Sequence, residues 1–254
     1  MSVRSIAAVS TCFVLLAVAA PPAAVGQDYA MYETQYLTVL PGHGDAFNAK
    51  MTEHNQQFHS EGPYTAAVFF IINGPRSGQI FWAMGPTTFT QLDSRPSGEP
   101  HDSDWGQEVL SHAEVGVTEY WRRNDDLSSL PDPDAPLQPL SRVRFFEVAD
   151  NALFVKTQEQ IEATVKAMGN ARARTFYRKQ FRHRDGRDWA LVTSYDTWAE
   201  LDVPGTGSFQ NTFVEVHGQA AWSTFQDERA AAVVGSEDEW RQRLPQPSGT
   251  DNDK

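Results

Sequence analysis

The sequence has a single cysteine, Cys12, which lies within the first 26 residues. That segment resembles a cleaved signal peptide, with Arg4 ahead of the apolar run Ile6–Ala20 and a small-x-small cleavage pattern at residues 24–26. We therefore expect an exported protein, secreted or periplasmic, whose mature chain starts at Gln27. Because Cys12 is removed with the segment, the mature chain has neither a disulfide nor a thiol nucleophile.

Positive charge is also scarce: 21 lysines and arginines face 33 aspartates and glutamates, for a net charge of −12. This balance argues against a nucleic-acid partner, since phosphate binding needs surplus basic residues. Beyond the first segment no apolar run is long enough to cross a bilayer. Glycine-rich phosphate loops, nucleophile elbows and paired zinc ligands are absent too. No motif indicates a type of reaction, so the function is predicted from the fold and from individual side chains.

The pattern that is present occurs twice. Residues 64–72 and 79–84 read as two strands joined by a turn, followed by a short helix that opens at Thr87. Strands at 173–181 and 188–193, with a short helix from Asp196, repeat this order 109 residues later. Each copy is preceded by a strand and a helix, 32–40 with 46–59 and 142–148 with 154–168. Each is followed by a helix and a strand, 104–115 with 116–124 and 209–234 with a strand from 234. The second of these helical segments is expected to break near Gly218.

The element order β-α-β-β-α-β is that of a ferredoxin-like unit and predicts an α+β fold. We expect two tandem units, residues 27–126 and 141–245, joined by a proline-rich linker at 127–140 and followed by a disordered tail at 246–254. The strand at 64–72 is apolar on both faces and must be covered on both. The two antiparallel sheets are therefore expected to pack as one intrachain α/β barrel with helices outside.

This order and its duplication resemble the dimeric α/β-barrel superfamily. That group includes antibiotic-biosynthesis-type monooxygenases, NIPSNAP-type proteins, and haem proteins of the chlorite dismutase and dye-decolourising peroxidase kind. The resemblance covers nearly all of Tyr32–Arg243 but matches no catalytic motif. It implies a fused pair of units, a ligand between a sheet and its helices, and oxidative chemistry. A homo-oligomer also fits this resemblance. A haem would need His54, His59 or His112 as its axial ligand.

His54 is the sharpest candidate for a catalytic residue. It shares one stripe of the helix 46–59 with Phe47, Met51 and Phe58, and an imidazole there needs partners for its ring nitrogens. It is either a hydrogen-bonded core histidine or a general base, metal ligand or haem ligand that faces a pocket. His59 lies on another face near the helix C-terminus, where a partly charged histidine is stabilising; it is also a ligand-binding candidate.

A second candidate site is a divalent metal centre. Asp104, Glu108 and His112 are spaced i, i+4, i+8 in the predicted helix 104–115 and would share one face, with His101 and Asp102 nearby. The alternative is a solvated helix face with an ordinary Glu108–His112 pair.

Aromatic and basic residues complete the candidates for ligand binding. Trp82, Trp105 and Tyr64 are predicted to line a pocket of the first unit for a flat or aromatic ligand, or else to be core anchors. Arg174 and Arg178 belong to a stripe of period two in the strand 173–181, and Arg142 and Arg144 are expected on the neighbouring strand 142–148. This stripe either binds a carboxylate or phosphate group or forms ion pairs within the barrel.

Two functions stay open. The first is an exported protein that binds a small, largely apolar or aromatic ligand in the first unit, with oxidative chemistry and with haem or a divalent metal as the cofactor. The alternative is a non-catalytic secreted or periplasmic scaffold or oligomerisation module.

Overall fold

The computed structural model describes residues 29–130, 137–169, 172–203 and 207–248. The predicted signal peptide, residues 1–26, lies outside these ranges, as do residues 131–136 of the predicted linker. In the described part of the chain, no helix is long and apolar enough to cross a membrane.

Eight strands form one closed barrel in which every neighbouring pair is antiparallel. The order around the barrel is β1-β3-β2-β8-β5-β7-β6-β4. The first half of the chain therefore contributes the order β2-β3-β1-β4, and the second half the same order, β6-β7-β5-β8. Two seams join the halves, β2 with β8 and β4 with β6. The strands are β1 (Met31–Val39), β2 (Ala66–Asn73), β3 (Ile80–Thr87), β4 (Ala113–Ser129), β5 (Leu140–Val148), β6 (Arg174–Lys179), β7 (Trp189–Tyr195) and β8 (Val233–Arg243).

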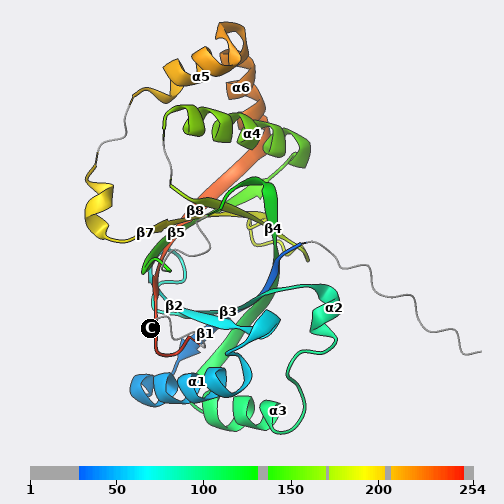
Figure 1. Ribbon diagram of the computed structural model, residues 1–254, viewed down its shortest axis with the longest axis vertical. Coiled ribbons are helices and arrows are strands. Elements are labelled where there is room, and N and C mark those ends of the chain that lie inside the picture. The colour runs from blue at the N-terminus through cyan, green and yellow to red at the C-terminus, as the bar shows by residue number, and fades with distance from the viewer. Residues whose placement is uncertain (1–28, 131–136, 170–171, 204–206, 249–254) are drawn as a thin grey trace, which may run out of the picture.

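The helices cover the outside of the barrel on two opposite sides (Figure 1). One side carries α1 (Gly44–Phe58) and α3 (His101–Asp104), with α2 (Phe89–Leu92) beside them, and the other carries α4 (Asn151–Ala167), α5 (Phe209–His217) and α6 (Gln219–Ala232). Under α1, Phe47 and Met51 are fully buried against the first half of the sheet. Under α4, Phe154 has the same role in the second half. The expected α+β fold is thus confirmed.

Gly218 separates α5 from α6 and has φ +88 and ψ 153. This backbone conformation is essentially restricted to glycine, so the second helical segment breaks where the sequence predicts.

The barrel interior has an apolar part and a charged part. An apolar cavity of about 190 Å³ is lined by aromatic side chains such as Phe69 and Phe145. Beside it, Arg187 and Arg241 each donate to the buried Tyr36 hydroxyl at 3.1 Å. Their carboxylate partners are buried as well, Glu119 at 2.6 Å from Arg187 and Glu239 at 2.6 Å from Arg241.

The segment around residue 104 differs from the prediction. The single helix expected at 104–115 is wrong: α3 ends at Asp104, a π-helical turn spans Trp105–Val109, and β4 already begins at Ala113. The amide of Leu110 donates to the carbonyl of Trp105 at 2.9 Å, an i→i+5 bond that rotates the following residues relative to an α-helix. β4 also continues to Ser129, into the expected linker.

The chain is also folded beyond the last strand. Asn55 Nδ2 donates to the carbonyl of Pro247 at 2.6 Å, and the amide of Val68 donates to Ser248 Oγ at 3.0 Å. Ser248 is only 3% exposed. Residues 246–248 therefore do not belong to a disordered tail, and the remainder of the predicted tail lies outside the described residues.

Candidate functional site

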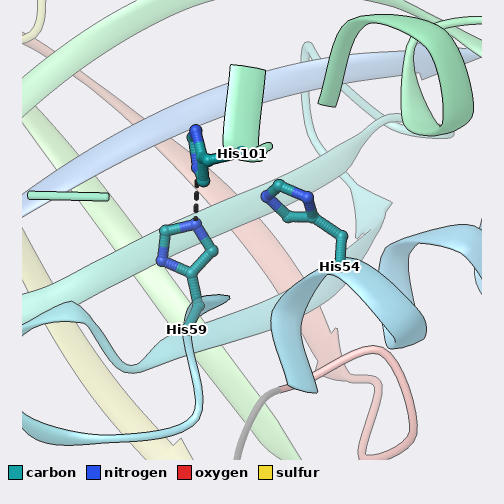
Figure 2. A group of neighbouring side chains, drawn as sticks. All are labelled: His54, His59 and His101. Carbon is teal, nitrogen blue, oxygen red and sulfur yellow. Dashed lines mark hydrogen bonds between the residues drawn. The ribbon is translucent and has the colours of Figure 1, made fainter. Parts of the chain in front are cut away.

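Three imidazoles converge between the first half of the sheet and its helices (Figure 2). His54 lies on α1, His59 directly follows that helix, and His101 opens α3. One ring nitrogen of each lies within 4.8 Å of the other two. His54 and His59 are 1% and 3% exposed, and His101 is half-buried. Residues that are 42 and 47 positions apart in sequence thus form one compact cluster.

Two of the three rings are oriented by carboxylates. His54 Nδ1 donates to Asp104 Oδ1 at 2.6 Å, and His101 Nδ1 donates to Asp102 Oδ1 at 2.8 Å. Because an ionised carboxylate only accepts hydrogen bonds, each contact places the ring proton on Nδ1. The Nε2 atom of each neutral ring then carries a lone pair. This is the outer-shell arrangement by which proteins orient metal-binding histidines.

The third ring is oriented by the backbone. His59 Nδ1 donates to the carbonyl of Tyr64 at 3.0 Å, which again leaves Nε2 as the atom with the lone pair. That Nε2 lies 3.3 Å from His101 Nε2. With both Nδ1 atoms protonated, two neutral rings would face each other lone pair to lone pair.

Among the described residues, one of these three Nε2 atoms lacks a partner, while the Nε2 atoms of His59 and His101 lie within hydrogen-bond distance of each other. His54 Nε2 is buried and has no hydrogen-bond partner. Burial lowers the pKa of His54 despite the hydrogen bond to Asp104, and burial together with the neighbouring His54 lowers the pKa of His59 to about 3. Both rings are therefore neutral near pH 7. Two buried, neutral imidazoles that converge with a third ring favour a bound cation over a purely structural role.

A cavity of about 230 Å³ adjoins the three histidines. Trp82 and Trp105, both predicted as pocket residues, line it with their ring centres 6.0 Å apart. The Trp105 ring lies 5.0 Å from the His54 ring, and the Trp82 ring lies 5.2 Å from the His59 ring. Tyr64 was predicted to line the pocket as well, but its hydroxyl donates to Gln91 and only its carbonyl serves the site.

The polar side of this cavity is formed by residues that the sequence patterns above do not predict. Glu33 is 5% exposed and pairs with Arg95 at 2.5 Å, and Gln35 Oε1 is buried without a hydrogen-bond partner. Both lie on β1 and line the cavity with Arg95. Alternation along the strand could have revealed them, because Glu33 and Gln35 share a face with the core residue Leu37.

The structure does not bring together the predicted metal set of Asp104, Glu108 and His112. The π-helical turn places them on different faces. Glu108 pairs with Lys50 at 3.0 Å, and His112 Nδ1 lies 2.9 Å from His43 Nδ1. Asp104 instead orients His54. Among the described residues, the histidine cluster is the group whose donor atoms are close enough for one ion.

The arginine stripe is mostly paired within the fold. Arg174 lies 2.8 Å from Glu162 of α4, and Arg142 and Arg144 both pair with Asp238 of β8. The expected adjacency of the two arginine strands is wrong, because β7 lies between β5 and β6. Arg178, by contrast, forms no ion pair with any residue that the structure describes.

The donor set fits a bare ion and not haem. Haem iron is held by protein ligands along its axis, on the two sides of the macrocycle. Here three donor atoms lie within 4.8 Å of one another, which leaves no room for a porphyrin plane among them. His112, the other predicted haem ligand, is occupied by His43. Three imidazoles around one ion is a known catalytic arrangement that leaves a coordination position open.

No family model and no curated protein matches this sequence. Solved structures match in fold. A proposed monooxygenase from Lactobacillus acidophilus has a TM-score of 0.51 at 12% identity, over 85% of this chain and 94% of its own. A proposed monooxygenase from Fusobacterium nucleatum has 0.51 at 8% identity, over 86% and 94%. A proposed chlorite dismutase has 0.50 at 8% identity, over 86% and 96%. At these identities the likeness is one of fold, and the chain has the α+β barrel architecture of monooxygenase-like and chlorite dismutase-like proteins.

Proposed function

We propose that the first half of this protein is a metal-dependent enzyme that binds a small, largely apolar ligand. A divalent first-row transition ion is held by the Nε2 atoms of His54, His59 and His101. The observation that carries the proposal is the convergence of three imidazoles, two of them buried, whose Nδ1 atoms are all engaged in hydrogen bonds. Imidazole suits zinc, copper, iron and nickel.

The ligand occupies the adjoining cavity, and the chain's own residues position it there. Trp82 and Trp105 supply flat apolar walls that exclude water, and Gln35 Oε1 is free to accept a hydrogen bond from a hydroxyl or amine group. Asp102 and Asp104 hold the metal-binding rings in place. The ion, when bound, supplies an open coordination position and, if it is copper or iron, one-electron chemistry.

We assign oxidative chemistry to this site. It is supported by a donor set that suits copper and iron, and the fold is that of proteins described as monooxygenases and chlorite dismutases. The proposal includes export to a secreted or periplasmic location through residues 1–26, and two ferredoxin-like units, which the identical strand order of the halves supports. Self-association stays a prediction.

Metal content tests the central claim. The mature chain is stripped with a chelator, exposed in turn to Zn²⁺, Cu²⁺, Fe²⁺ and Co²⁺, desalted, and analysed by mass spectrometry of its metals. We expect one ion per chain, lost in each of His54→Ala, His59→Ala and His101→Ala. His112→Ala is the matched control, because this histidine lies in the same half and outside the cluster, and it should keep the ion. Wild-type protein that retains no metal would refute the proposal.

The identity of the native ion tests the oxidative part separately. Protein purified from an exporting host without added metal should carry copper or iron. Zinc alone would contradict oxidative chemistry while leaving the metal centre intact. The non-catalytic alternative predicts instead that His54→Leu leaves every binding signal unchanged and stabilises the fold.

A further inference from the structure

A second polar pocket lies on the outer face of the barrel along the β4–β6 seam. Its walls include Arg122, Asn124, Asn151, Arg178 and Trp189, and its volume is about 720 Å³. It shares no lining residue with the cavity of the histidine cluster and plays no part in the function proposed above.

The two arginines of this pocket face each other. Arg122 of β4 and Arg178 of β6 are direct register partners across the seam. Like charges directly opposite each other on neighbouring strands destabilise a sheet. Neither guanidinium forms an ion pair or hydrogen bond with a described residue, although the chain as a whole is strongly acidic. This pairing is unfavourable unless something negative lies between the two side chains.

Aromatic rings hold both guanidinium groups. The Arg122 Cζ atom lies 4.1 Å from the centre of the Tyr29 ring, and the Arg178 Cζ atom lies 5.9 Å from the centre of the Trp189 ring. A guanidinium held over a ring face keeps its N–H edge available for a planar or tetrahedral anion. The stacking therefore restricts the side chains without neutralising them.

The side chains of two asparagines add further donors. The backbone N–H of Leu127 donates to Asn124 Oδ1 at 2.9 Å, and Trp189 Nε1 donates to Asn151 Oδ1 at 3.0 Å. Because both partners are donors, these contacts fix the orientation of each asparagine side-chain amide and engage its Oδ1 atom as the acceptor. Each asparagine keeps an NH₂ group whose capacity to donate is not used by these bonds.

The acids that line the pocket are largely neutralised. Asp125 pairs with Arg123, and Asp188 pairs with Arg182 at 2.8 Å. Asp126 has no ion pair with a described residue and stays as one opposing charge in the pocket. An incoming anion would meet two unpaired guanidinium groups against one unpaired carboxylate.

We propose that this pocket binds an oxyanion, the carboxylate or phosphate group of a small molecule, between Arg122 and Arg178. Asn124 and Asn151 complete the donor set. Forked hydrogen bonds from two guanidinium groups are the arrangement by which proteins recognise such groups. The bound charge also offsets the repulsion across the seam.

Calorimetric titration of the mature chain at low salt tests this site, with inorganic phosphate and succinate as separate probes. We expect at least one probe to bind, and Arg122→Gln and Arg178→Gln each to weaken it at least tenfold. Arg182→Gln removes the same charge from the same pocket but from a side chain already paired with Asp188, so it should change affinity less than threefold. Asp126→Asn should strengthen binding.

Thermal unfolding without ligand supplies a second readout. If the seam holds two opposed charges, Arg178→Gln should raise the melting temperature in phosphate-free buffer and abolish the rise that the bound probe gives wild-type protein. Failure of both probes to bind, or an equal loss in all three arginine variants, would overturn the proposal. Neither result bears on the histidine cluster, whose metal content is measured independently.

Discussion

Packing in the core does not account for an imidazole at position 54. His54 lies on the buried stripe of α1, and its Nε2 atom is left without a partner. The sequence pattern predicts a role for His54 because its imidazole lies on an apolar stripe, and it predicts one for His59 separately. It does not predict that both cluster with His101, since the α3 turn that carries His101 is too short to show periodicity.

Asp104 should act on the metal through His54. Asp104→Asn keeps the shape of the side chain but removes the charge that holds the ring, so we expect metal affinity to fall roughly 10- to 100-fold with the fold intact. Competition with a chromophoric chelator measures this directly. Glu108→Gln removes a carboxylate four residues on that faces Lys50 instead, and it should leave affinity unchanged. Equal losses in both variants would show that general charge, not ring orientation, matters.

At the scale of elements, most strands and the long helices follow from alternation and from the 3.6-residue period. The exception is the segment between α2 and β4. Residues 101–112 are split between a single α-helical turn and a π-helical turn, and the i→i+5 bond at Leu110 has no counterpart in a periodic pattern. The wrong helix placed Asp104, Glu108 and His112 on one face and so predicted a metal set that does not form.

Ion pairs of the Asp238 carboxylate with Arg142 and Arg144 link β8 to β5. Burial alone would raise the pKa of Asp238, but hydrogen bonds from Arg144 and Arg142 outweigh it and lower the pKa to about 2. Since the pKa is lower in the folded state than the ordinary value of about 3.9, the stabilisation is complete above about pH 4 and is lost as pH falls from 4 towards 2.

Urea unfolding at a series of pH values measures this dependence. Asp238→Asn should be less stable than wild type at pH 5 and should lose less further stability between pH 4 and pH 2. Asp202→Asn, at an exposed carboxylate without an ion pair in the described chain, should follow the wild-type curve. Parallel curves for wild type and Asp238→Asn would rule out this role for the carboxylate.

At the scale of the whole molecule, the duplication predicts two similar sheets, and the strand apolar on both faces predicts that they enclose a core. The pattern does not say which edges meet. The seams β2–β8 and β4–β6 depend on long-range contacts, among them a buried charge network around Tyr36. Glu239 of β8 accepts from Arg241 and also from Arg76 of the first half at 2.7 Å.

Glu239 should therefore be needed to hold the halves together. Glu239→Ala leaves the buried Arg241 with uncompensated charge and removes one of the two carboxylates that pair with Arg76, and we expect a loss of about 3–5 kcal/mol in the free energy of unfolding. Glu237→Ala removes another partner of Arg76, but one that is a third exposed, and should cost less than about 1 kcal/mol. Chemical denaturation compares the two. A Glu239→Ala variant as stable as Glu237→Ala would mean that the network does not join the halves.

The contact between Asn55 and Pro247 constrains the order in which parts of the protein fold. Asn55 is the neighbour of His54, it accepts from Trp82 Nε1, and its amide donates to a residue 192 positions later in the chain. During synthesis, the helix that carries His54 emerges from the ribosome long before the segment that fastens it. The first half can gather its histidines early, but their geometry becomes fixed only when residues 247 and 248 dock. Metal capture is thus expected to follow the docking of residues 247 and 248, so the ion is taken from the compartment in which that step occurs.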